Sequence, residues 1–88
     1  MDYLLFTLPG CLKCEALKTA LAARGAAWRE FNLVGKEAKA KLREYRDVVR
    51  RDESGAVVLP ALVLVEDGAA RGVVHSAEEF DAWLRSRA

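Results

Sequence analysis

Both cysteines of this 88-residue chain lie in one short stretch, Thr7-Leu8-Pro9-Gly10-Cys11-Leu12-Lys13-Cys14-Glu15-Ala16-Leu17. The segment before it is almost continuously apolar, and the residues after it repeat apolar side chains at helical spacing. Pro9-Gly10 is typical of a turn between such segments. We therefore expect a strand over residues 3–8 and a helix over residues 11–24, with the cysteines where the helix begins.

The three-residue spacing of the cysteines suits redox chemistry. Residues three apart in a helix share a face, so Cys11 and Cys14 can form a disulfide with little backbone movement. Unpaired N–H groups and the helix dipole favour a thiolate at a helix N-terminus, which makes Cys11 the predicted nucleophile. Lys13 and, more distantly, Lys18 are expected to add positive potential near its sulfur. Cys14, one turn into the helix and less exposed, is the predicted resolving cysteine.

Composition and net charge indicate the type of domain, the compartment and the classes of partner that are not expected. The chain is 52% hydrophobic and 31% charged, which is typical of a single soluble domain, here residues 1–88. It has no apolar run of membrane-spanning length and starts without the features of a secretory signal, so we expect a cytoplasmic protein. Cytoplasmic thiols are kept reduced, which favours a catalytic or metal-binding Cys-x-x-Cys over a structural disulfide. A net charge of +1 gives no reason to expect a nucleic-acid or membrane partner.

The rest of the chain predicts three more strands and two more helices. The expected elements are strands over residues 27–33, 61–65 and 71–74, a helix from Gly35 to about Arg50, and a helix after Ser76. Glu66-Asp67-Gly68 is a hairpin turn signal, and Ser76-Ala77-Glu78-Glu79 has the Ser-x-x-Glu form of a capping box. The order βαβαββα predicts an α/β fold with a four-stranded mixed sheet and helices on both faces.

Four residues outside the cysteine stretch carry further expectations. Pro60 cannot donate in a strand ladder, so it should lie at the entrance of the third strand. Trp28 and Trp83 should bury their rings in the core. His75, alone after a strand, is expected at the surface and is assigned no role.

With this element order, the whole chain resembles the glutaredoxin-like branch of the thioredoxin fold. The matching segments are residues 6–14 at the cysteine pair and Val58-Leu59-Pro60-Ala61-Leu62, where the family carries Thr-Val-Pro. The resemblance implies that Pro60 is cis and lies opposite the cysteines, and that Leu59 presents its backbone N–H and C=O to an extended substrate. The residues expected to contact substrate are Thr7, Leu12, Lys13, Leu59 and Pro60.

The resulting prediction is an enzyme, a dithiol oxidoreductase that reduces protein or small-molecule disulfides. The cysteine pair is itself the redox centre, so no separate cofactor is expected and no metal ligand is assigned. The resemblance implies electrons from glutathione or from a flavoprotein of the thioredoxin-reductase type. Leu12-Lys13 stands where glutathione-using members typically carry Pro-Tyr, and the choice between the two donors stays open. The expected partner is a disulfide-containing protein, and the expected state is a monomer.

Two other functions would use the same cysteines. Two thiolates are half of a tetrahedral zinc or iron–sulfur site, so a dimer could carry a metal or cluster between its subunits. The pair could also be a switch in an interaction module, with slow exchange and an unperturbed thiol. Bound metal, or visible absorbance in protein purified without oxygen, separates the carrier from the oxidoreductase.

Overall fold

The computed structural model describes residues 1–87, which form a mixed α/β fold. Its elements in chain order are β1 (Asp2–Thr7), α1 (Leu12–Ala23), β2 (Trp28–Asn32), α2 (Lys36–Arg43), β3 (Ala61–Glu66), β4 (Ala69–Val74) and α3 (Ala77–Arg87). The strand order in the sheet is β2-β1-β3-β4. β1 pairs with β2 in parallel and with β3 antiparallel, and β3 pairs with β4 antiparallel. The predicted order βαβαββα and the mixed four-stranded sheet are confirmed.

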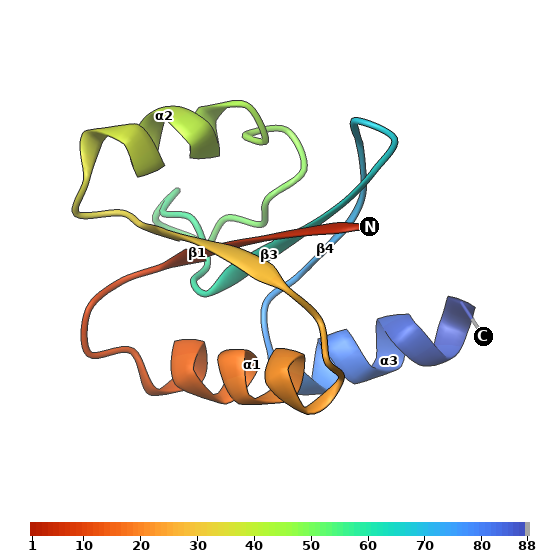
Figure 1. The fold of residues 1–88 in the computed structure, drawn as a ribbon. Helices are drawn as coiled ribbons and strands as arrows, with labels where there is room; N and C mark the ends of the chain where they lie inside the picture. Colours follow the sequence, from red (N-terminus) through yellow and green to blue (C-terminus); the bar gives the residue numbers. More distant parts are fainter. Residues whose placement is uncertain (88) are drawn as a thin grey trace.

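Helices cover both faces of the sheet, as predicted. Figure 1 shows α1 and α3 on one side of the sheet and α2 on the other. Successive strand residues point to opposite faces, so Leu5 of β1 packs on the α1 and α3 side, whereas Leu4 and Phe6 pack on the other. Burying a leucine side chain contributes roughly 1.5–3 kcal/mol. The central strands β1 and β3 therefore anchor two apolar clusters at once.

The two clusters account for the buried apolar residues of the sheet. The first consists of Leu5, Leu17, Leu21, Leu62, Leu64, Val74 and Phe80. The second consists of Leu4, Phe6, Val49, Ala61, Val63 and Val65. Trp28 and Trp83 pack against the first cluster but are only half-buried, so their predicted place in the core is met in part.

The turn between β3 and β4 confirms the hairpin signal. Asp67 and Gly68 have φ angles of 54° and 78°, so both adopt the left-handed conformation of a two-residue hairpin turn. Asp tolerates this conformation better than most residues, and Gly adopts it at no steric cost. The turn is tight enough for β4 to begin at Ala69, two residues earlier than predicted.

The second helix is shorter than the sequence predicts. α2 ends at Arg43 and not near Arg50. In residues 44–46 each backbone N–H bonds to the carbonyl three residues earlier, which is tighter winding than an α-helix. The chain after this winding still places Val49 in the second cluster and Tyr45 against it. Both apolar side chains therefore reach the core without a continuous helix. Their helical spacing in the sequence is the reason why a longer helix is predicted.

Candidate functional site

Cys11 lies at the N-terminus of α1, where the sequence predicts the nucleophile. Gly10, just after the end of β1, turns the chain into the helix with φ at 70°, a conformation that glycine adopts freely. Cys11 is the N-cap residue, and its Sγ accepts a hydrogen bond of 3.1 Å from the Cys14 N–H. That N–H is one of the donors at the helix start that have no partner within the helix. It is therefore placed to stabilise negative charge on the Cys11 sulfur.

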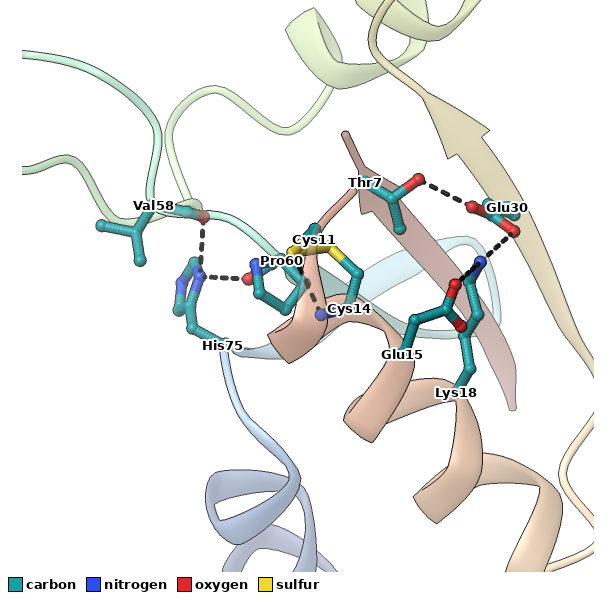
Figure 2. The surroundings of a disulfide bond; sticks show 9 residues. All are labelled: Thr7, Cys11, Cys14, Glu15, Lys18, Glu30, Val58, Pro60 and His75. Atoms are coloured by element: carbon teal, nitrogen blue, oxygen red, sulfur yellow. Dashed lines mark hydrogen bonds and ion pairs between the residues drawn. A yellow bond between two sulfur atoms is a disulfide. The ribbon is translucent and has the colours of Figure 1, made fainter. Parts of the chain in front are cut away.

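Cys14 differs from Cys11 mainly in exposure. Cys14 is 2% exposed, whereas Cys11 is half-buried. The two form a disulfide, with their α-carbons 5.2 Å apart (Figure 2). An incoming molecule reaches Cys11 more easily than Cys14, and Cys14 stays within bonding reach of Cys11. This asymmetry suits the predicted nucleophilic and resolving roles.

The two residues between the cysteines project outwards. Leu12 is 86% exposed, and Lys13 is also exposed. Both side chains are thus available to a molecule that docks at Cys11. Their contact with substrate stays a prediction.

Thr7, Glu30 and Lys18 form a polar chain beside the cysteine turn (Figure 2). The buried Thr7 hydroxyl donates to Glu30 Oε2 at 2.8 Å, and Lys18 Nζ lies 2.9 Å from Glu30 Oε1. Desolvation raises the pKa of Glu30, but the hydrogen bonds from Lys18 and Thr7 outweigh it and hold the pKa below its ordinary value. The hydrogen bond to Glu30 in turn raises the pKa of Lys18. The substrate contact expected of Thr7 stays a prediction, and its side chain is engaged inside the protein.

The ion pairs of Lys18 correct one electrostatic expectation. Besides Glu30, its Nζ lies 3.7 Å from Glu15 Oε1. Two carboxylates close to one ammonium offset its positive charge locally. Lys18 therefore supplies less positive potential to Cys11 than the sequence predicts.

The Leu59–Pro60 segment enters β3 at the same end of the sheet as the cysteine turn. Phe6 of β1 pairs with Ala61 of β3, which places Pro60 close to the chain that leads to Cys11 (Figure 2). The Leu59–Pro60 bond is cis, as the resemblance implies, and Pro60 is buried. Within residues 1–87, neither backbone group of Leu59 is paired with another backbone group. Both groups are thus left over for an external extended chain.

His75 is buried, which corrects the expectation that it lies at the surface. It is 5% exposed and joins the end of β4 to the start of α3. Its Nδ1 lies 3.0 Å from the carbonyl oxygens of both Val58 and Pro60 (Figure 2). No local pattern indicates this burial, because it depends on a segment 15 to 17 positions away, the one that also carries the predicted substrate contacts Leu59 and Pro60. The imidazole therefore belongs to the candidate site.

The start of α3 also differs in one detail from the predicted capping box. Ser76 Oγ accepts from the Glu79 N–H at 3.1 Å, as expected, but Glu79 Oε1 accepts from the His75 N–H at 2.8 Å instead of from Ser76. The Glu79 carboxylate also forms two hydrogen bonds with the Arg50 guanidinium, at 3.1 and 3.2 Å. The hydrogen bonds from Arg50 and then from His75 lower the pKa of Glu79. Glu79 thus links His75 to the segment that follows α2.

A cavity of about 260 Å³ opens between α1 and the start of α3. Lys13 and Ala16 of α1 form one wall, and residues 75–78 at the start of α3 form the other. The two walls come from segments that are far apart in the sequence. Local sequence patterns therefore do not predict this cavity. A small group bound in this cavity would lie next to the predicted substrate contact Lys13.

Two features are absent from the part of the chain that the structure describes. Across residues 1–87, no three side chains of the His, Cys, Asp and Glu types are grouped so that they could hold a metal ion. No helix in that range has both the length and the apolar character needed to cross a membrane.

Comparison with known proteins assigns the chain to no family. No protein-family model matches the sequence, and no curated protein matches it. The function must therefore be inferred from the cysteine pair and its surroundings.

Proposed function

We propose that this protein is a thiol–disulfide oxidoreductase built on the glutaredoxin-like form of the thioredoxin fold. The observation that carries the proposal is the placement of the cysteine pair. Cys11 is accessible at a helix N-terminus with its Sγ bound by the Cys14 N–H, while Cys14 is buried behind it. The mixed sheet covered on both faces and the cis Leu59–Pro60 bond ahead of β3 support the fold assignment.

The proposed reaction begins from the reduced pair. The Cys11 thiolate attacks one sulfur of a substrate disulfide, which forms a mixed disulfide and releases the other substrate sulfur as a thiolate that takes a proton from water. Cys14 then loses its proton and attacks the Cys11 Sγ. The mixed disulfide breaks and the second substrate thiolate leaves. The substrate gains two electrons, and the protein is left with the Cys11–Cys14 disulfide.

The proposed docking edge is the free backbone of Leu59. An extended peptide that bears a disulfide can pair with unpaired N–H and C=O groups as an added strand. Because Leu59 precedes the buried Pro60 beside the cysteine turn, such a peptide would lie across Cys11. Leu12 and Lys13 would flank it from the helix side.

Regeneration of the dithiol needs a reductant, for which two classes are proposed. Two molecules of glutathione can reduce the disulfide and become one molecule of glutathione disulfide. Alternatively, a flavoprotein reductase can deliver two electrons from NADPH. In either case the proposed physiological substrate is a disulfide-containing protein.

Two parallel assays of NADPH consumption test the proposal. One couples the protein to glutathione and glutathione reductase with a small disulfide as substrate. The other couples it to thioredoxin reductase with a protein disulfide as substrate. Cys11→Ser is the matched control, because it keeps the fold and Cys14 but removes the nucleophile.

Turnover that depends on Cys11 in either assay supports the oxidoreductase, and the active assay identifies the class of electron donor. Absence of turnover in both assays, combined with retention of added zinc by the reduced protein, contradicts it. That result would favour a metal carrier that uses the same thiolates.

A further inference from the structure

The buried His75 ring makes hydrogen bonds through one of its two nitrogens. Nδ1 lies 3.0 Å from the carbonyl oxygens of Val58 and Pro60, both of which only accept hydrogen bonds. Nδ1 must therefore carry the ring proton and share it between the two carbonyls. Nε2 is buried and has no hydrogen-bond partner within residues 1–87. An unprotonated Nε2 leaves only a lone pair unsatisfied, so the tautomer with its proton on Nδ1 fits this environment.

The two carbonyls that His75 holds lie on either side of Leu59. The Val58 carbonyl belongs to the same planar peptide unit as the Leu59 N–H. This bond is trans, since within residues 1–87 only the Leu59–Pro60 bond is cis. In a trans peptide the C=O and the N–H point in opposite directions. By fixing the Val58 carbonyl, His75 therefore also fixes the direction of the Leu59 N–H. This N–H points away from the imidazole.

The position of His75 is itself fixed by two charged residues. Glu79 accepts from the His75 N–H at 2.8 Å and binds the Arg50 guanidinium through both oxygens. The Arg50 carbonyl accepts from the Val58 N–H at 2.9 Å. Val58 is thus held from one side by His75 and from the other by Arg50, and Glu79 joins the two.

We propose that His75 is a positioning residue for disulfide exchange, which orients the Leu59 backbone by donating its Nδ1 proton to the Val58 and Pro60 carbonyls. The proposal rests on the proposed oxidoreductase function and specifies its substrate class. Backbone pairing at Leu59 is possible only for a substrate that has peptide groups. His75 therefore favours disulfides carried by an extended polypeptide over small disulfides without a peptide backbone.

The test compares His75→Leu with His75→Asn, a pair of nearly equal shape. Asn places an amide N–H donor at the position of Nδ1, whereas Leu has no donor. Pre-reduced protein is mixed in single turnover with a disulfide-bonded extended peptide or with bis(2-hydroxyethyl) disulfide, so no electron donor is needed. The alkylation rate of Cys11 by iodoacetamide reports its reactivity without docking, and thermal unfolding reports folding.

We expect His75→Leu to lower the second-order rate constant for the peptide about tenfold, the effect of one hydrogen bond. Its reaction with bis(2-hydroxyethyl) disulfide and with iodoacetamide should stay within about twofold of the wild type. His75→Asn should recover most of the loss with the peptide. Equal losses with both disulfides, no loss with either, or failure of Asn to recover more than Leu would overturn the proposal.

Two further results keep this test separate from that of the function itself. A wild-type protein that reduces neither disulfide overturns the oxidoreductase, and the role of His75 falls with it. If the His75 variants do not fold, ¹⁵N chemical shifts of the wild-type imidazole decide. A protonated Nδ1 with an unprotonated Nε2 supports the proposal, and the opposite tautomer contradicts it.

Discussion

The backbone N–H of Cys14 donates to the Sγ of Cys11 over 3.1 Å, so the residue predicted to resolve the reaction also stabilises the predicted nucleophile. The arrangement arises because Cys11 caps α1 and Cys14 occupies its first turn. A sulfur that accepts this bond and faces the positive end of the helix dipole is favoured as a thiolate. Reagents in solution reach the buried Cys14 sulfur less easily than the Cys11 sulfur.

The reduced protein should therefore be alkylated selectively at Cys11. With iodoacetamide in limiting amount, we expect Cys11 to be modified at least about ten times as often as Cys14, because the thiolate is the reactive form and must be reachable. Peptide mapping by mass spectrometry gives the ratio. The same protein unfolded in urea is the control and should show nearly equal labelling. Equal labelling in the folded protein would contradict the assigned roles.

Thr7→Val should destabilise the fold by about 1–2 kcal/mol, because it removes a buried hydroxyl that donates to a charged carboxylate. Urea unfolding measures the change in free energy. Thr19→Val is the control, since its exposed hydroxyl bonds only to the Glu15 carbonyl, and it should change stability by no more than about 0.5 kcal/mol. Similar decreases in the free energy of unfolding of both variants would show that the Thr7–Glu30 hydrogen bond contributes no more to stability than the exposed Thr19–Glu15 bond.

The same Thr7→Val variant also tests the predicted substrate contact. The exchange rate is measured well below the unfolding temperature, so that only folded protein is compared. A rate that falls relative to wild type would support contact between Thr7 and substrate. An unchanged rate would restrict Thr7 to its structural bond with Glu30.

The Glu79 carboxylate should make the fold sensitive to acid. Its pKa is lowered from an ordinary value of 4.5 by Arg50 and by the His75 N–H. Because the pKa is lowered in the folded state, the ionised Glu79 carboxylate makes its full contribution to the stability of the fold above the unfolded-state pKa. This contribution is lost as the pH falls through the folded-state pKa. We therefore expect Glu79→Gln to cost about 0.5–1 kcal/mol at neutral pH and progressively less as the pH falls through the folded-state pKa, because the wild-type carboxyl is then protonated and neutral as well.

Urea unfolding at several pH values measures this difference between wild type and Glu79→Gln. Glu78→Gln is the matched control, because Glu78 is exposed and directly precedes Glu79 in the sequence. The control should follow the wild type at every pH. A Glu79→Gln difference that stays constant as the pH falls would rule out the charge of Glu79 as its cause.

The features that the sequence predicts correctly depend on neighbouring residues. Pro9-Gly10 before the cysteines, Asp67-Gly68 in the hairpin, and Ser76 at the start of α3 each specify their own local geometry. The almost continuous apolar run along β1 likewise indicates a strand buried on both faces. These signals were sufficient for the element order and for the place of the cysteine pair.

The features that the sequence did not predict depend on contacts between distant segments. Thr7 bonds to Glu30, 23 positions away, and His75 bonds to Val58, 17 positions away. No local pattern indicates such partners, so the sequence predicts neither the Thr7–Glu30 hydrogen bond nor the burial of His75. The early end of α2 has the same origin, since packing on the sheet holds Tyr45 without further helical turns.

The most direct test of the central claim is to trap the mixed disulfide. Pre-reduced wild type, Cys11→Ser and Cys14→Ser are each mixed with a protein disulfide, quenched with acid and examined by intact-mass spectrometry. The account predicts that Cys14→Ser accumulates a covalent adduct through Cys11, wild type yields reduced substrate with its own disulfide, and Cys11→Ser does neither. Equal adducts from both variants, or no reaction by wild type, would contradict it.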